Sequence, residues 1–578
     1  MVPPARSLAV GFLFATLACQ PPTPAGGVPS GDGPEYDLIL TGGRIIDGSG
    51  NPWFYGDVAI RGERISRITP PGMLAKAAAK QRLDATGRVI APGFIDIQAQ
   101  SVAAFTLGDG RVISSVTQGI TTAILGEGST PAPSNDRIIA ALAGSEVALK
   151  PALEKFRGPR GFNAWLEMMH DHGVSQNVGS FLGAATARIY AKGEAQGEAT
   201  PAELDTIRTV VKHAMEDGAF GVASALIYPP ASYASTEELI AQAKAAAPYG
   251  GVYITHMRSE ADRFLEAIDE AIRIGREGGV PVEIYHLKAS GTANWSKMPL
   301  AIAKIDSVRN AGQDVTADMY LYTAGGTSLA ACAPPWAAEG GKLLANLQDP
   351  TVRAKIKAEM TGARMTNSEG LCTLGGPGGV QVVGFTTAGL KQYEGQRLDH
   401  IATAMKRDWF EAWSDIVVGE KAAIGAIFHM MTESNLPLQI RQPWIKWGTD
   451  ADGMDPDNTG GRLAHPRAYG NYPRLLGRYV REQKVIGLEE AIRKGTSAVA
   501  RRLMIKERGL LEEGYFADVI VFDPATVIDR ATFEQPHQLS VGIEHVFVNG
   551  MAVVTAGKHT GAKPGKIVRG AGWTGRNQ

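Results

Sequence analysis

Cysteine is scarce in this 578-residue chain, and its scarcity excludes two kinds of protein. Cys19, Cys332 and Cys372 are the three cysteines, and no CxxC pair occurs. A disulfide-built scaffold and a thiolate metal motif are therefore excluded. Cys332 and Cys372 remain compatible with one disulfide in an exported protein or with two buried free thiols. A metal site in this chain would have to use histidine and carboxylate ligands.

Excess charge and known phosphate or calcium loops are also absent. The chain has 58 Lys+Arg and 59 Asp+Glu, a net charge of −1, which leaves no basic footprint for nucleic acid. The Gly-rich run 374–384 lacks GxxxxGK[ST], and the acidic run 450–458 lacks the EF-hand spacing, so both are expected to be loops. These absences favour a small molecule as the partner and leave the oligomeric state open.

No apolar run is long enough for a permanent membrane helix, but the first residues resemble an export signal. Arg6 is followed by the short apolar run Leu8 to Ala18, and Cys19 comes directly after it. The residues TLAC resemble a bacterial lipobox, so residues 1–19 predict export and a lipid anchor on Cys19, with a flexible linker over 20–35. The expected location is the periplasm. Plain signal cleavage and a cytoplasmic tail are the alternatives.

The remaining chain predicts an α/β protein in two parts. Short alternating strands with glycine turns occur at residues 36–92 and again at 506–565, so both ends are expected to build one composite β-sandwich-like domain, followed by a tail over 566–578. Between them, residues 93–505 alternate strands and helices, which indicates a (β/α)8 barrel with a doubly wound sheet as the alternative. An insertion is expected at about 331–441, where this alternation breaks.

The stretch Val252 to Lys288 predicts a strand, a helix and a second strand. His256 and His286 close the two strand patterns, and the intervening helix is expected to begin with a capping box at Ser259–Asp262 and to end at Gly278 and Gly279. Parallel strands joined in this way bring both imidazoles to one edge of the sheet. Paired histidines there suggest a metal site, and two hydrogen-bonded core histidines are the alternative.

Three more charged residues follow strand patterns of the same region. Asp450 comes after the strand WIKWG and could move protons as a general acid or base. Lys288 lies two residues past His286, which on an extended strand places both side chains on one face. Lys288 could bind a carboxylate or a phosphate, Arg467 could bind a carboxylate through two hydrogen bonds, and ordinary ion pairs are the alternative for both.

In this order, the motifs resemble the amidohydrolase superfamily and specifically its D-aminoacylase (N-acyl-D-amino-acid deacylase) branch. The resemblance covers about residues 36–565 and rests on YDLILTGGRIIDGSG, APGFIDIQAQ, VTQGITTAILGEG, GAFGVASALIYPP, THMRSE, YHLK, DMYLYTAGGTS, GTD, HPRAYGNYPRLLGRYV and ARRLMIKERGLLEEGYFADVIVFD. It implies a barrel with a flanking β-domain. It also implies zinc-dependent hydrolysis of an amide C–N bond, by a metal-activated water, in N-acyl-D-amino acids.

The resemblance also assigns residues to roles. His256 and His286 would be zinc ligands, and Asp450 would be the general acid/base. Lys288 and Arg467 would hold the substrate α-carboxylate, and Tyr320 would lie close to the scissile group. The family's serine six residues beyond that tyrosine is Gly326 here.

The chain departs from the superfamily pattern at the metal ligands. The HxH motif of the first strand reads Gln98-Ala-Gln100, so one zinc ion per chain is expected in place of two. The branch's third ligand is a cysteine in a GNCG turn, and the matching turn here is Gly126-Glu127-Gly128. Glu127 is therefore the expected oxygen ligand.

Two other functions fit the same residues. One is an amidohydrolase that acts on a cyclic amide, an aryl amide or a D-dipeptide. The other is a lipid-anchored binding protein without catalysis on an amidohydrolase scaffold, which Gln98 and Gln100 would explain.

Overall fold

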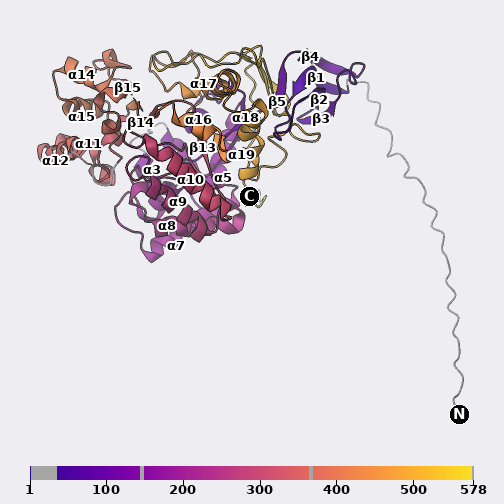
Figure 1. The fold of residues 1–578 in the computed structure, drawn as a ribbon. Coiled ribbons are helices and arrows are strands. Elements are labelled where there is room, and N and C mark those ends of the chain that lie inside the picture. The colour runs from indigo at the N-terminus through magenta and orange to yellow at the C-terminus, as the bar shows by residue number, and fades with distance from the viewer. Residues whose placement is uncertain (2–34, 143–148, 363–368, 576–578) are drawn as a thin grey trace.

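A barrel of parallel strands is the centre of the computed structural model, which describes residue 1 and residues 35–142, 149–362 and 369–575 (Figure 1). Two parallel sheets make up the barrel, with strand orders β6-β7-β8 and β17-β13-β12-β11-β10-β9. The strands are β6 (Phe94–Asp96), β7 (Ile120–Leu125), β8 (Asn177–Ser180), β9 (Leu182–Gly183), β10 (Gly221–Ala225), β11 (Val252–His256), β12 (Val282–Ile284), β13 (Val315–Met319) and β17 (Ile445–Trp447).

Backbone hydrogen bonds join the two sheets into a closed ring. β8 and β9 form one strand position interrupted at Phe181, whose N–H still donates to the Leu125 carbonyl of β7 at 2.9 Å. At the other seam the Asp450 N–H donates to the Gln98 carbonyl at 2.7 Å, and the Gln100 N–H donates to the Ala451 carbonyl at 3.0 Å. Eight strand positions therefore close on themselves, which confirms the (β/α)8 barrel and rules out the doubly wound sheet.

Helices surround the ring, as the alternating pattern predicts. Those that follow barrel strands include α5 (Gly161–His172), α6 (Ala184–Lys192), α7 (Pro201–Glu216), α8 (Thr236–Ala246), α9 (Phe264–Gly278), α10 (Met298–Asn310), α16 (Asn435–Ile440), α17 (Arg467–Arg474), α18 (Leu488–Gly495) and α19 (Ser497–Arg502). Four short helices precede them in the chain: α1 (Val102–Thr106), α2 (Ile113–Val116), α3 (Asp136–Leu142) and α4 (Lys150–Lys155). The apolar faces of the helices pack on the strands and form the largest core.

The start of α9 differs from its predicted start. The helix begins at Phe264, and the Ser259 hydroxyl instead accepts hydrogen bonds from the N–H groups of Ala261 and Arg263 at 3.3 and 3.2 Å. The predicted capping box is therefore wrong, because the serine organises a loop between strand and helix. The predicted end is confirmed: Gly279 caps the helix in the left-handed conformation (φ 71°).

Both ends of the chain build one sheet, as predicted. Its order is β21-β20-β19-β18-β5-β1-β2-β3, and β4 also pairs with β1. The antiparallel pairing of β18 with β5 joins the two sequence segments. The strands are β1 (Tyr36–Ile45), β2 (Phe54–Arg61), β3 (Arg64–Thr69), β4 (Ala79–Asp84), β5 (Val89–Pro92), β18 (Val519–Phe522), β19 (Ile543–Val548), β20 (Met551–Thr555) and β21 (Lys558–His559).

A separate small unit interrupts the barrel between β13 and β17. It contains β14 (Gly325–Ser328), α11 (Leu343–Gln348), α12 (Pro350–Thr361), α13 (Leu371–Leu374), β15 (Val380–Val383), α14 (Leu398–Met405), α15 (Trp409–Gly419) and β16 (Gly425–Phe428). The three strands form an antiparallel sheet with its own apolar core. Cys332 and Cys372 form a disulfide within this unit, with their Cα atoms 5.4 Å apart.

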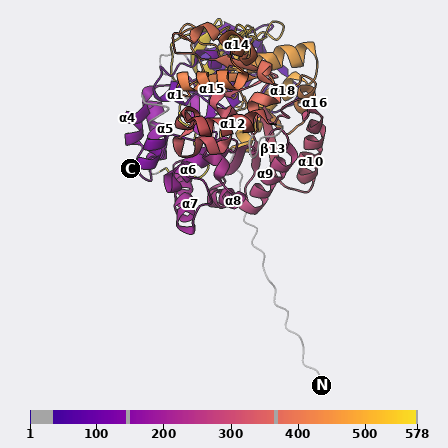
Figure 2. The same cartoon turned by 90° about the vertical axis from the view of Figure 1, so that its left-hand side faces the viewer.

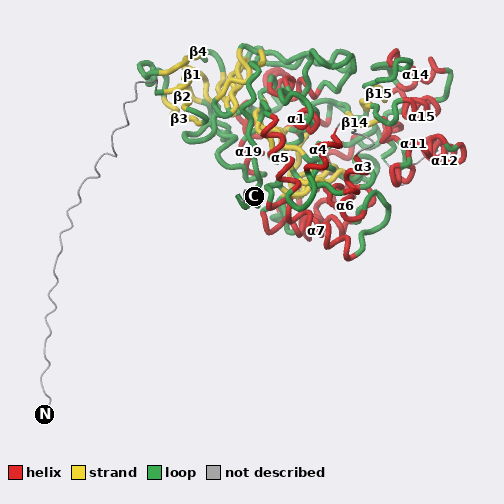
Figure 3. Tube along the Cα trace, turned by 180° about the vertical axis from the view of Figure 1, so that it is seen from behind, coloured by secondary structure: helices red, strands yellow, loops and turns green. Residues whose placement is uncertain are grey.

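The small unit and the composite sheet lie on opposite sides of the barrel. Viewed from the side of the small unit, α12, α14 and α15 stand in front of the ring of helices (Figure 2). From behind, the strands β1 to β4 occupy one end of the molecule and α11 to α15 the other (Figure 3). The small unit also supplies Leu371 and Phe428 to the wall of the site described below.

The predicted export signal and linker, apart from Met1 and Glu35, lie outside the described residues. Within the parts of the chain that the structure describes, no helix has the length and apolar character needed to cross a membrane.

Candidate metal centre

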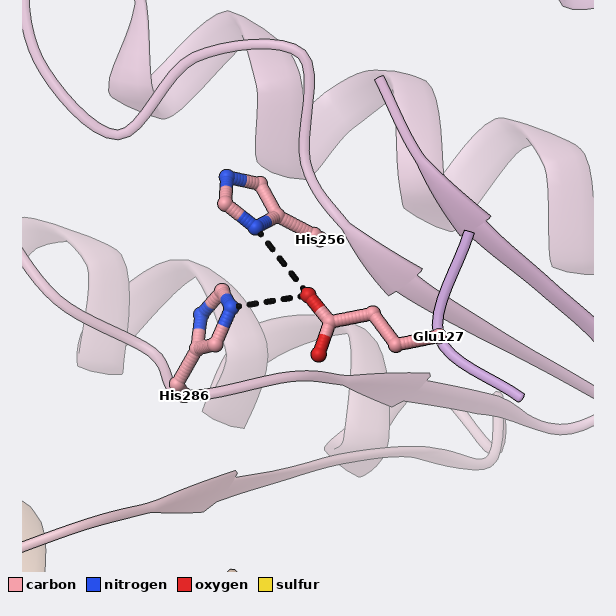
Figure 4. Close-up of side chains that lie close together, drawn as sticks. All are labelled: Glu127, His256 and His286. Atoms are coloured by element: carbon pink, nitrogen blue, oxygen red, sulfur yellow. Dashed lines mark hydrogen bonds and ion pairs between the residues drawn. The ribbon is translucent and has the colours of Figure 1, made fainter. Parts of the chain in front are cut away.

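Three side chains from three barrel strands converge at the carboxyl edge of the barrel. One carboxylate oxygen of Glu127, Oε1, lies 3.2 Å from Nδ1 of His256 and 3.3 Å from Nε2 of His286 (Figure 4). The two imidazole rings stand nearly perpendicular, with centroids 4.4 Å apart. Among the described residues these three form the group whose ligand atoms all lie within 4.8 Å of one another. The structure thus brings together the three residues that the sequence predicts as metal ligands.

A glycine turn after β7 directs Glu127 toward the histidines. Gly126 has φ 113° and Gly128 has φ 72°, conformations that favour glycine. A Cβ on Gly126 would lie 2.4 Å from the Phe181 carbonyl oxygen, so the backbone also leaves no space for a side chain there. The Gly-Glu-Gly sequence therefore permits the chain to reverse beside β8 and β9 with the carboxylate pointing into the site.

His286 reaches the site in a different way from the prediction. β12 ends at Ile284, and His286 itself adopts a positive φ of 33°. Asp318 of β13 holds this bend, because its Oδ1 accepts from the His286 N–H at 2.8 Å. The two-residue alternation of a strand therefore does not explain why Lys288 lies beside His286. Asp318 is a site residue that the sequence analysis missed, since the next strand must be in place to show its contact.

Electrostatics keep the Glu127 carboxylate ionised. Burial on its own would raise the pKa of Glu127, but hydrogen bonds and charge interactions with the two imidazoles hold its pKa well below the usual value. Burial lowers the pKa of His256. Burial and Lys288 also oppose the charged form of His286, yet Glu260 and Glu127 raise the pKa of His286 to about 10. A negative oxygen thus faces two imidazole nitrogens inside the protein.

Glu260 is a second buried carboxylate that the sequence analysis did not single out. Its Oε1 lies 2.9 Å from Nδ1 of His286 and accepts from the Lys288 ammonium at 2.6 Å. Lys288 Nζ is also 2.9 Å from Nδ1 of His286. Burial would raise the pKa of Glu260, whereas Lys288 and the two histidines lower it. The motif THMRSE contained this residue four positions after His256, which is the signal that could have identified it.

Asp450, Arg467 and Tyr320 form a second group of side chains that line the same pocket. Asp450 follows β17 with a positive φ of 51°, and its Oδ2 lies 2.7 Å from Nη1 of Arg467. The guanidinium stacks over the Tyr320 ring at 4.5 Å and donates to the Gly326 carbonyl at 3.2 Å. Burial raises the pKa of Asp450 against the opposing effect of Arg467. Strongly perturbed carboxyl groups of this kind are common at catalytic sites.

Gln98 and Gln100 also reach the centre. Each amide nitrogen donates to Oε2 of Glu127 at 2.6 Å, and that of Gln100 lies 3.2 Å from Oδ1 of Asp450. The two residues therefore act as hydrogen-bond donors to a carboxylate, in the place where the superfamily pattern has histidines.

A pocket of ≈490 Å³ opens onto these groups. Its lining includes the polar and charged groups of the site together with Gly326: Glu127, His256, Glu260, His286, Lys288, Tyr320, Asp450 and Arg467. Its remaining wall is largely apolar and includes Leu142, Ile189, Ile227, Leu371, Phe428 and Met430. Such a pocket suits a small molecule that has both a polar reacting group and an apolar part.

The donor set fits a divalent ion. Two imidazole nitrogens and one carboxylate oxygen are ligands that zinc accepts in catalytic sites, where three protein ligands leave a further position open. Nδ1 of His256 and Nε2 of His286 both face Oε1 of Glu127, whereas the buried Nε2 of His256 makes no hydrogen bond among the described residues and lies 3.7 Å from Oε2 of Glu260. The site lies at the carboxyl ends of the barrel strands and has two histidines and one carboxylate as its ligand set. These features are together those of a metal-dependent hydrolase.

Comparison with known proteins leads to the same class. The amidohydrolase family model matches residues 438–554. The D-aminoacylase of Alcaligenes xylosoxydans xylosoxydans is 32% identical over 538 residues, which cover 93% of this chain and 98% of the relative. Among solved structures, the N-acyl-D-glutamate deacylase of Bordetella bronchiseptica, complexed with zinc and a phosphonate inhibitor, superposes with a TM-score of 0.75 at 30% identity, covering 92% of this chain and 99% of its own.

A D-aminoacylase described with a binuclear metal centre superposes with a TM-score of 0.74 at 30% identity, covering 92% of this chain and 100% of its own. The chain belongs to the amidohydrolase superfamily and, within it, to the D-aminoacylase branch.

Proposed function

We propose that this protein hydrolyses the amide bond of N-acyl-D-amino acids with one zinc ion per chain. The observation that carries the proposal is that Glu127, His256 and His286 line the same pocket of small-molecule size as the Asp450–Arg467 pair. The D-aminoacylase and the N-acyl-D-glutamate deacylase that resemble the chain over most of its length support the reaction class. The expected single ion rests on Gln98 and Gln100, whose amides donate to Glu127 and offer no imidazole ligand for a second ion.

Glu127, His256 and His286 would hold the zinc ion, which when bound lowers the pKa of a water to about 7 and polarises the scissile carbonyl. Asp450 would accept the proton of the attacking water and return it to the leaving nitrogen, so that the amine departs neutral. Asp318 and Glu260 would hold His286 from its backbone and from its second ring nitrogen.

Arg467 is the residue best placed for the substrate α-carboxylate. It lies on the wall of the pocket, and its buried Nε has no hydrogen-bond partner among the described residues. A guanidinium can bind a carboxylate through two parallel hydrogen bonds. Lys288 would add positive charge to the pocket. Much of this charge is already neutralised by Glu260, whose Oε1 lies 2.6 Å from the Lys288 ammonium. The stacked Tyr320 ring would keep the guanidinium in place.

A substrate panel tests this function together with the role of Arg467. The purified protein with zinc supplied should release amine from N-acyl-D-amino acids faster than from N-acyl-L-amino acids. Arg467→Ala should raise KM for the carboxylate-bearing substrates about 10- to 100-fold, because a charge-assisted hydrogen bond of roughly 1.5–3 kcal/mol is lost. Product amine is measured by a fluorogenic assay.

Amides without a carboxylate, either aryl or cyclic, serve as the control in the same panel. Both substrate types depend on Asp450, so an indirect effect of Arg467→Ala through that residue would affect both. An equal loss for both types would contradict carboxylate binding, and wild-type turnover of the carboxylate-free amides alone would favour the alternative amidase function. Tight binding of N-acyl-D-amino acids without turnover would instead support the non-catalytic binding protein.

We also propose export to the periplasm with a lipid anchor on Cys19. The apolar run Leu8 to Ala18 directly before Cys19 supports export, and the disulfide between Cys332 and Cys372 supports an oxidising compartment. Cells that express the full chain with labelled palmitate should yield labelled protein in the membrane fraction, and Cys19→Ala should abolish the label. Unlabelled wild-type protein in the soluble periplasmic fraction would instead indicate plain signal cleavage.

A further inference from the structure

Two glutamine side chains hold one oxygen of the Glu127 carboxylate. The Nε2 atoms of Gln98 and Gln100 both lie 2.6 Å from Oε2, whereas the other oxygen, Oε1, faces His256 and His286. The carboxylate is thus divided between two sets of partners. Oε2 is occupied by amide donors, and Oε1 is turned toward the imidazole nitrogens.

The chemistry of the groups fixes which end of each amide faces the carboxylate. An ionised carboxylate only accepts hydrogen bonds, so the NH₂ group and not the carbonyl must point to Glu127. The carbonyl oxygen of Gln98 is left buried and without a hydrogen-bond partner among the described residues. The Gln98 amide thus donates to Glu127 although its own carbonyl oxygen accepts no hydrogen bond from the described residues. We take this as a sign that the contact with Glu127 orients the side chain.

Two donors on one oxygen restrict how Glu127 can rotate. Glutamate has three side-chain torsions, and its terminal torsion is broad, so without these contacts either oxygen could face the histidines. Hydrogen bonds to a ligating carboxylate orient it and tune its affinity for the metal. The Gln100 amide nitrogen also lies 3.2 Å from Oδ1 of Asp450, so the same amide links the Glu127 and Asp450 carboxylates.

We propose that Gln98 and Gln100 are positioning residues that fix Glu127 as a zinc ligand through one oxygen. The proposal rests on the zinc site of the proposed function and extends it to two residues that do not touch the ion. It assigns a role to the two positions at which the histidines of the superfamily pattern are missing. Where the superfamily pattern has two histidines that could bind a metal, this chain has two glutamines whose amides donate hydrogen bonds to Glu127.

Zinc affinity, measured by competition with a chromophoric chelator, tests the proposal independently of activity. Gln98→Met and Gln100→Met keep most of the side-chain volume and remove the donors. Each variant should raise the zinc Kd about 10- to 100-fold, the usual effect of losing a partner of a ligand. In a Glu127→Ala background the same substitutions should change the Kd by less than about 2-fold, because the group that they position is gone.

Gln176→Met is the matched control. Gln176 is buried in the same barrel, its Nε2 makes two hydrogen bonds, to Ser115 Oγ and the Ile120 carbonyl, and its Oε1 makes none. Its substitution should leave the zinc Kd unchanged, with thermal unfolding recorded for every variant. Because Gln98 is fully buried and Gln100 only partly, Gln100→Met provides the test if Gln98→Met does not fold.

Three results would overturn the positioning role. They are an unchanged zinc Kd in both glutamine variants, an equal weakening in the wild-type and Glu127→Ala backgrounds, and an equal weakening by Gln176→Met. A wild-type protein that binds no zinc would refute the proposed function itself. The same zinc titration therefore distinguishes failure of the positioning role from failure of the proposed function.

Discussion

Asp450→Asn should lower kcat for an N-acyl-D-amino acid by about 10²- to 10⁴-fold, the range that a positioned general acid/base contributes. Zinc content should remain at the wild-type level, because Asp450 is not one of the three residues whose ligand atoms all lie within 4.8 Å of one another. Asparagine also suits the backbone conformation at this position. Asp450 has a positive φ of 51°, a conformation that asparagine also tolerates, so the backbone can be retained.

The measurement pairs steady-state kinetics with metal analysis of the same sample. Asp450→Asn also leaves Arg467 without its partner at 2.7 Å, so a change in KM is expected beside the fall in kcat. Asp457→Asn, on an exposed part of the same acidic loop, is the control and should leave both quantities unchanged. A fall in zinc content with Asp450→Asn would show that the aspartate is a ligand, and a kcat within about 3-fold of wild type would exclude it as the proton carrier.

His286→Ala should reduce bound zinc from about one equivalent to well under one and remove measurable turnover. The side chain is buried and contacts Glu127 with one ring nitrogen and Glu260 with the other. Its loss removes an expected ligand and also one partner of both the Glu127 and the Glu260 carboxylates. Metal analysis of protein dialysed against metal-free buffer measures the effect.

His545→Ala is the control for general damage by a lost histidine. His545 lies on β19 in the composite sheet and should retain full zinc occupancy. Bound zinc that stays at one equivalent in His286→Ala would contradict the proposed ligand set, whatever the activity. Loss of zinc in both variants would indicate instability rather than a missing ligand.

The sequence determined the architecture because local patterns carry it. Alternating strand and helix segments, glycine stops such as Gly279, and the Thr200 capping box of α7 all specify elements from neighbouring residues. The composite sheet followed from similar strand patterns at the two ends of the chain. The motif order was sufficient to identify the superfamily and the D-aminoacylase branch, which the comparisons confirm.

The sequence was less informative where chain geometry departs from regular elements. The capping box at Ser259 has the right residue types, yet the loop folds around that serine and α9 begins at Phe264. The choice between a disulfide and two thiols for Cys332 and Cys372 required their Cα separation of 5.4 Å. Strand alternation stopped at Ile284, so it could not predict how His286 and Lys288 lie.

Sequence alone therefore determined which residues reach the carboxyl edge of the barrel: Glu127, His256, His286 and Asp450 each follow or end a strand pattern. Only the tertiary structure decided what they contact there. Gln98 and Asp450 are 352 positions apart in the chain and meet because the barrel closes between β6 and β17. Hydrogen bonds are short and directional, so the amide donors on Glu127 and the Glu260–Lys288 pair exist only once every strand is in register.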